Sequence, residues 1–170
     1  MKKLLILLMF SASVAYAQTS VDDSRKDLVS NLSSTGDYSM FTNALNVTGL
    51  SQTIKSNGPF TLFAPTDKAF EKMQASEELM KSENKEQLTK LLSNHILTGK
   101  YTSKSIKEAI EQGKGKAEFK TLSGGTIVAS LSDNSILLTD ESGTTSRVSM
   151  PDQNSENGII HVVDTAGTSK

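Results

Sequence analysis

The spacing of hydrophobic positions along this chain changes near residue 113. Before that point, apolar residues recur every three or four positions over several stretches, which is typical of amphipathic helices. After it, short β-rich runs are separated by Gly-Gly, Asp-Asn and Ser-Gly pairs about nine residues apart, as in antiparallel strands joined by tight turns. No long internal repeat is present, so we expect one domain with a helical first part and a β-rich second part.

Several helices are predicted in the first part. The strongest apolar stripe has members at helical spacing: Leu88, Leu91, Leu92, His95 and Ile96. Gly99 is expected to end this helix, and Asn84 with Gln87 favours a capping box at its start. Further helices are predicted over residues 37–48, 50–57, 67–82 and 103–112. Residues 22–32 form either a short helix or a loose N-terminal segment that leads into the domain.

Strands are predicted where apolar residues alternate with polar ones or form short continuous runs. The expected ranges are 60–64, 117–122, 126–131, 135–139, 144–150 and 158–164. The first and last of these are apolar on both faces, so both are expected to be buried in the middle of a sheet. In the strand over 126–131, apolar residues alternate with polar ones, so one face of this part of the sheet is expected to be apolar and buried. Residues 151–157 are polar and are predicted to form a loop.

One short stretch, Gly58 to Phe70, specifies a strand, a corner and a helix together. A glycine-proline pair begins it with a turn, and Pro65 ends the strand because proline cannot donate to a sheet ladder. Thr66 is a good N-cap for the following helix, and Asp67 places negative charge at the positive end of that helix. The aromatic side chains of the stretch are expected in the core: Phe60, Phe63 and Phe70.

This stretch resembles the first signature motif of the fasciclin (FAS1) domain family, which runs roughly Gly-Pro-Phe-Thr-x-Phe-Ala-Pro-Thr-Asp/Asn-x-Ala-Phe. Residues 91–101 resemble the family's central Tyr-His motif, with Asn94 where the family has tyrosine, and residues 157–164 resemble its last motif, Asn-Gly-Val-Ile-His-Val-Ile-Asp. The resemblance covers about residues 30–164 and implies an α+β fold, a fasciclin-like β-wedge of short strands with a packed helical layer. It assigns structural roles to the matching motif residues: Phe60, Phe63, Pro65, Thr66, Asp67, Phe70, His95, Gly158, His161 and Asp164.

The N-terminus has the order of an export signal: Lys2-Lys3, an apolar run, and the small-x-small cleavage site Ala15-Tyr16-Ala17. The apolar run is too short to remain as a membrane span. We therefore expect a signal peptide over 1–17, a lead over 18–36, a fasciclin domain over 37–164 and a tail over 165–170. The basic start looks bacterial, so the mature chain is expected to be periplasmic or secreted.

Charge and composition exclude several classes of partner. Without the two lysines of the signal, 18 − 2 = 16 basic residues face 19 acidic ones, a formal charge of −3 with no footprint for nucleic acid. The chain contains no cysteine, so its core must supply the stability that exported domains often take from disulfides. The absence of tryptophan and the presence of three tyrosines leave few flat rings for stacking on sugars or bases.

The two histidines, His95 and His161, are the candidate chemical groups. They could serve as metal ligands or general bases, or they could be buried with their ring nitrogens satisfied locally, with Asp67 as the expected partner of His95. Because no cysteine and no acidic residue stands at ligand spacing, no metal or cofactor is expected. No serine lies in a Gly-x-Ser-x-Gly elbow, and residues 113–116 lack the strand and the ending of a phosphate loop.

The resemblance implies an exported, non-catalytic binding module for cell-surface or extracellular-matrix adhesion, with a protein or a glycan as partner. In animal members, a Pro-Asp-Ile segment before the last motif has been linked to receptor binding. Pro151 and Asp152 stand at that position here, with Gln153 replacing the isoleucine, and are the candidate partner-binding residues. If they lie on a loop, Asp152→Ala should leave the melting temperature nearly unchanged. The alternative function is a small-ligand-binding protein or an enzyme that uses a pocket in the β-wedge.

Overall fold

The computed structural model describes residues 25–73 and 76–167. The expected signal peptide over 1–17 lies outside these residues, as do residues 18–24 of the lead over 18–36 and the last three residues of the tail over 165–170. Within the described ranges, no helix combines the length and the apolar character needed to cross a membrane.

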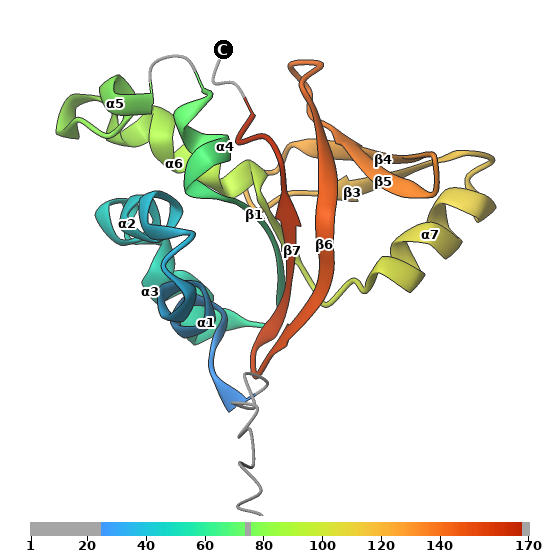
Figure 1. The fold of residues 1–170 in the computed structure, drawn as a ribbon, viewed down its shortest axis with the longest axis horizontal. Helices are drawn as coiled ribbons and strands as arrows, with labels where there is room; N and C mark the ends of the chain where they lie inside the picture. The colour runs from blue at the N-terminus through green and yellow to red at the C-terminus, as the bar shows by residue number, and fades with distance from the viewer. Residues whose placement is uncertain (1–24, 74–75, 168–170) are drawn as a thin grey trace, which may run out of the picture.

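Most of the helices lie together on one side of the molecule (Figure 1). This helical layer comprises α1 (Leu28–Thr35), α2 (Ser39–Thr48), α3 (Leu50–Asn57), α4 (Asp67–Glu71), α5 (Ser76–Leu79), the 3₁₀ turn η2 (Ser82–Asn84) and α6 (Lys85–Asn94). The remaining helix, α7 (Ser103–Gln112), packs against β3 and β4 at the opposite end of the molecule.

Seven strands form one sheet in the order β2-β1-β7-β6-β5-β4-β3. The strands are β1 (Phe60–Pro65), β2 (Ile96–Thr98), β3 (Lys116–Lys120), β4 (Thr126–Ser132), β5 (Ser135–Thr139), β6 (Thr145–Ser155) and β7 (Gly158–Val163). Only β1 and β7 pair in parallel among these neighbours, and the others pair antiparallel. The sheet curls so far that its two ends meet. Leu97 of β2 forms a β-bridge with Thr121, which lies just after β3.

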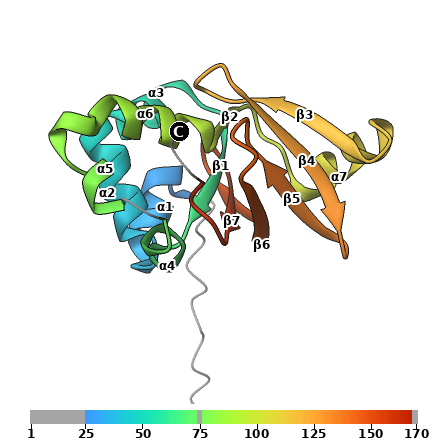
Figure 2. The same ribbon diagram turned by 90° about the horizontal axis from the view of Figure 1, so that it is seen from above.

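The buried apolar side chains form two hydrophobic cores. The helical layer and α7 lie on opposite sides of the curled sheet (Figures 1 and 2). The first core lies between the helical layer and the sheet and contains Phe41, Phe60 and Phe70. The second lies between α7 and the curled strands and contains Phe63, Ile106 and Phe119. This arrangement confirms the expected α+β fold.

The parallel contact of β1 with β7 depends on a close backbone approach at Gly158. A Cβ atom on Gly158 would lie 2.0 Å from the carbonyl oxygen of Phe60 and 2.8 Å from Cδ1 of Leu28. Asn157 closes the same corner from the other side, because its side chain accepts from the Leu28 amide at 2.8 Å and donates to the Ile54 carbonyl at 2.9 Å. The end of the β6–β7 hairpin therefore holds α1 and α3 against the sheet.

The short-helix alternative for the lead is confirmed, although α1 begins six residues later than the expected start at residue 22. Asp27 caps it by accepting from the amides of Val29 and Ser30 at 2.9 and 3.0 Å. Leu28 and Leu32 are then buried in the first core. The end of the lead is thus part of the packed structure.

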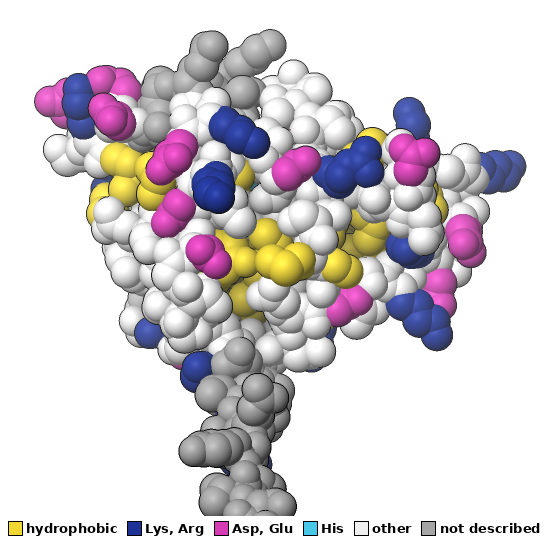
Figure 3. Space-filling view, viewed as in Figure 1, with side chains coloured by type: hydrophobic (Ala, Val, Ile, Leu, Met, Phe, Trp, Pro, Cys, Tyr) yellow, Lys and Arg dark blue, Asp and Glu magenta, His cyan; other side chains and the backbone are white. Residues whose placement is uncertain are grey.

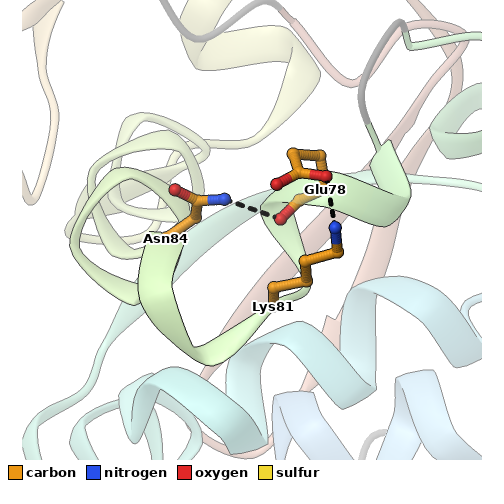
Figure 4. Close-up of polar contacts among 3 residues, drawn as sticks. All are labelled: Glu78, Lys81 and Asn84. Atoms are coloured by element: carbon orange, nitrogen blue, oxygen red, sulfur yellow. Dashed lines mark hydrogen bonds and ion pairs between the residues drawn. The ribbon is translucent and has the colours of Figure 1, made fainter.

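The predicted helix over 67–82 is wrong. Helix α4 ends at Glu71, and α5 and η2 follow as separate short turns. The predicted capping box is also wrong, because the Asn84 side chain donates to the carbonyl of Glu78 at 2.8 Å (Figure 4). Lys81 pairs with the carboxylate of Glu78 at 2.6 Å beside it, so this connection is held by contacts within residues 78–84.

The expected end of the next helix at Gly99 is wrong as well. Helix α6 ends at Asn94, and Ile96–Thr98 instead forms β2. These residues pair with Phe60–Leu62 of β1, and the Phe63 amide donates to the His95 carbonyl at 2.8 Å. Strand β2 covers this edge of β1. The backbone N–H and C=O groups along the edge thereby find partners that a longer helix could not supply.

Residues 151–155 do not belong to the predicted loop over 151–157, and only Glu156 and Asn157 form a turn. Strand β6 continues to Ser155 and stays paired with β7, with register shifts between Val148 and Met150 and between Met150 and Gln153. Asp152 has a φ of +64° within this irregular part, so an extra residue is accommodated as a bulge. The first five residues of the predicted loop are therefore held in the sheet.

Candidate functional site

His161 lies on β7 with none of its surface exposed. Its ring stacks on Phe63, with centroids 5.6 Å apart and planes 26° apart. Nε2 lies 2.8 Å from the carbonyl oxygen of Tyr101, and Nδ1 accepts from the backbone amide of Asp152 at 3.2 Å. Since a carbonyl can only accept and an amide N–H can only donate, the proton resides on Nε2 and the ring is neutral.

His95 follows the last residue of α6 and is 8% exposed. Its Nε2 lies 2.7 Å from the carbonyl oxygen of Ala166, and Phe41 meets the ring edge-on with centroids 6.0 Å apart. The contact joins the end of α6 to the segment that follows β7. His95, like His161, is thus packed inside the fold with a ring nitrogen next to a backbone carbonyl.

The expected contact between His95 and Asp67 is wrong. The Asp67 carboxylate accepts from the amides of Ser39 and Met40 at 3.2 and 2.8 Å, at the start of α2. Tyr38, the N-cap of α2, supplies no side-chain cap, so the free amides of that helix take a carboxylate from α4 instead. Thr66 caps α4 itself by accepting from Ala69 at 3.2 Å.

Burial lowers the pKa of both histidines, because taking an imidazolium out of water is costly. Nearby carboxylates oppose this effect: Asp140 raises the pKa of His95, and Asp152 raises that of His161. Burial is the larger cause in both cases, so both rings are neutral at pH 7. Within residues 25–73 and 76–167, no three side chains of the metal-ligating types lie together.

Asp152 is half-buried and its carboxylate is bound by the protein. Its carboxylate accepts from the Ser103 amide at 2.7 Å and also from the Ser103 hydroxyl. Thr102 caps α7 in addition, by accepting from the Ser105 amide at 3.1 Å. The bulge of β6 therefore supplies a second acceptor and a negative charge to the N-terminus of α7.

These contacts replace the expectation that Asp152→Ala leaves stability unchanged. We expect this substitution to lower the free energy of unfolding by about 1–2 kcal/mol, the usual effect of losing a helix cap. Urea unfolding would measure the change. Glu156→Ala is the control, because Glu156 is exposed just after the same strand, where surface substitutions shift stability by about 0.5 kcal/mol or less. Equal stability of Asp152→Ala and the wild type would contradict the capping role.

The exposed part of the segment lies just before Asp152. Pro151 is exposed, and Met150 is 51% exposed, more than the other large apolar side chains exposed in the described part of the chain, Val47 at 39% and Leu131 at 38%. Figure 3 shows apolar surface in the middle of this face of the molecule, where β6 and β7 lie in Figure 1. Charged side chains surround it.

The wedge also contains a small, partly open cavity of about 30 Å³. Its lining includes His95, Asp140, Thr144 and Ser146. The volume suits one or two water molecules and is far below the roughly 300 Å³ at which small-molecule pockets begin. Oδ1 of Asp140 accepts from the amides of Ser142 and Thr144, each at 2.9 Å, so this carboxylate shapes a turn. The cavity does not favour the ligand-binding alternative.

The structure distributes the motif residues among several contacts. Phe60, Phe63 and Phe70 are buried, Pro65 ends β1, and Gly158 begins β7. The Asp164 carboxylate accepts from the Arg147 amide at 2.8 Å, at the far end of the β6–β7 pair. Ser103 was missed as a partner of Asp152, since a serine just after an N-cap carries no signal for a contact 49 positions away.

The chain was compared with known proteins. The family model described as Fasciclin domain matches residues 36–166. Protein sll1483 of Synechocystis sp. is 30% identical over 156 residues, which cover 91% of this chain and 78% of the relative. Human periostin is 33% identical over 130 residues, covering 75% of this chain but 14% of periostin.

A solved structure shares the fold. A FAS1 domain pair from the insect cell adhesion molecule fasciclin I superposes with a TM-score of 0.72 at 21% identity, covering 82% of this chain and 50% of that one. The family match extends over most of the described residues, and it includes the corner at Gly58 to Phe70, both buried histidines and the β6–β7 hairpin. The chain therefore belongs to the fasciclin-domain family.

Proposed function

We propose that this protein is an exported, non-catalytic binding module that mediates adhesion at a cell surface or in a matrix, through Met150 and Pro151 on β6. The observation that carries the proposal is the exposure of these two apolar residues on a strand that is otherwise fixed by pairing and by Asp152. Apolar side chains presented on a rigid support suit recognition of a partner.

Two further points support this function. The solved relative is described as coming from a cell adhesion molecule. Pro151 also occupies the position that the family resemblance links to receptor binding in animal members. Because Met150 and Pro151 are apolar and exposed, the partner that suits them best is a protein. Export itself is checked by the intact mass of the mature protein, which should begin at Gln18.

Attachment of protein-coated beads to cells of the producing species tests the proposal. Met150→Ser and Pro151→Ala are expected to reduce attachment, because they remove exposed apolar contact area, while changing the free energy of unfolding by about 0.5 kcal/mol or less. Leu131→Ser is the matched control, since Leu131 is also exposed, at 38%, but lies on β4.

Three outcomes would count against the proposal. Equal attachment of the wild type and both β6 variants would remove this surface from consideration. An equal loss in the Leu131→Ser control would indicate general stickiness rather than a specific site. Turnover of a small substrate by the wild-type protein would overturn the non-catalytic assignment.

A further inference from the structure

The buried ring of His161 and the carboxylate of Asp152 lie at the bulge of β6, and the position of each group depends on that of the other. Nδ1 of His161 accepts from the backbone amide of Asp152 at 3.2 Å. The carboxylate of the same residue accepts from the Ser103 amide at 2.7 Å and so holds the N-terminus of α7. Asp152 has a φ of +64°, a conformation that costs free energy in a residue other than glycine and that its neighbours must maintain.

We propose that His161 and Asp152 form a pH-responsive latch, in which the neutral ring holds α7 on the sheet and a proton on Nδ1 releases the start of that helix. The proton comes from solvent and adds to the bare ring nitrogen. Nδ1–H and the Asp152 amide would then be two donors facing each other, so their hydrogen bond is lost.

The Asp152 carboxylate has two competing partners in this arrangement. With a neutral ring, it accepts from Ser103. With a charged ring, the imidazolium beside it is the stronger partner, because a charge-assisted contact at low dielectric exceeds a bond to a neutral amide. To reach Nδ1–H, the carboxylate must leave Ser103. The exchange gives the segment two discrete states.

The groups that face the ring come from three elements. Strand β1 presents Phe63, the segment before α7 presents the carbonyl of Tyr101, and β6 presents Asp152. The Tyr101 phenol instead packs edge-on against Phe119, with ring centroids 5.1 Å apart. Asp152 is the charged group that acts on His161 and favours the imidazolium, whereas burial opposes it more strongly.

The direction of the response follows from this balance. Burial lowers the pKa of His161 from 6.5, so the unfolded chain takes up a proton at a higher pH than the folded chain does. The stability due to the neutral ring is therefore fully present above pH 6.5 and declines as the pH falls below it. Since Thr102 still caps α7, we expect the helix to persist while its first residue leaves β6.

Nuclear magnetic resonance of the full mature chain tests the latch. At pH 7.5 the ¹⁵N shifts of His161 should show a proton on Nε2 and a bare Nδ1. As the pH falls below about 6.5, the opened fraction at the Ser103 amide, obtained from hydrogen exchange after correction for the intrinsic rate, should rise about tenfold per pH unit until the ring is protonated. The Ile160 amide in the central strand should stay protected, which separates local release from global unfolding.

Three variants sharpen the test. His161→Gln should make the opening at Ser103 independent of pH, whereas His95→Gln should leave the response unchanged. Asp152→Asn keeps an acceptor for Ser103 but removes the anion, so it should move the titration of the ring to lower pH. If His161→Gln does not fold, a shared midpoint of the ring and the Ser103 amide in the wild type decides the question.

Several results would overturn the latch. One is a Ser103 amide whose opening does not change between pH 7.5 and 5. Another is a ring that titrates without any response at Ser103, or a response that persists in His161→Gln. The inference does not depend on the proposed adhesion function, and unchanged bead attachment in the Met150 and Pro151 variants would leave it untouched.

Discussion

Replacing Phe63 by alanine is expected to lower the free energy of unfolding by about 3–5 kcal/mol. Phe63 is 1% exposed and belongs to the second core, between α7 and the curled strands. It also stacks on His161 and lines the cavity of the wedge, so its removal would enlarge an existing space and expose the buried ring. The expected loss is a large share of the 5–15 kcal/mol that stabilises a typical domain.

Urea unfolding followed by circular dichroism measures this change. Leu131→Ala is the control for truncating an apolar side chain, because Leu131 is 38% exposed on the same curled sheet and should lose far less. Phe70→Ala, 1% exposed in the first core, should match Phe63→Ala in size. A loss below about 1 kcal/mol for both phenylalanines would show that neither is part of the core that holds the fold.

Gly158→Ala adds only one methyl group, yet it is expected to lower stability about as much as Phe63→Ala does. The new Cβ would stand 2.0 Å from the Phe60 carbonyl oxygen, which is backbone and cannot rotate away. Strands β1 and β7 would have to separate along a parallel pair that runs from Phe60 to Pro65. Overpacking a core costs about 1–3 kcal/mol, and a clash with a paired backbone falls at or beyond the upper end of that range.

Gly125→Ala separates this effect from the general cost of replacing glycine. Its Cβ would meet Oγ of Ser123 at 3.3 Å, a side-chain atom that can rotate, and Gly125 does not require a positive φ. We expect Gly158→Ala to lower the urea midpoint strongly or to prevent accumulation of folded protein, and Gly125→Ala to change it little. Equal midpoints for the two variants would contradict the close approach of β1 and β7.

The sequence predicted those elements whose signals are local. Residues 126–132 and 135–139 form strands close to the expected bounds, because alternation and turn residues act over a few positions. Thr66 caps its helix as expected, since an N-cap hydroxyl reaches amides within the first turn of the helix. The three motifs also indicated the family and, with it, the wedge of sheet and helices.

The sequence failed where a distant segment competed for the same backbone. Ile96 continues a helical apolar stripe, yet it forms a strand because the edge of β1 is available to it. The polar run after Met150 reads as a loop, yet β7 pairs with it and α7 takes its carboxylate. Leu62, the partner of Ile96 on β1, and Ser103, the partner of the Asp152 carboxylate, both lie outside a window of ten residues.

The candidate site shows the same division. The sequence by itself determined that two histidines lie within apolar motifs and that Pro151 and Asp152 precede the last strand. Only the tertiary structure decided that His95 bonds to Ala166, that Asp67 caps α2 and that Asp152 joins His161 to Ser103. The physical reason is that buried polar groups must find partners wherever the fold brings them, and these partners lie 9 to 71 positions away along the chain.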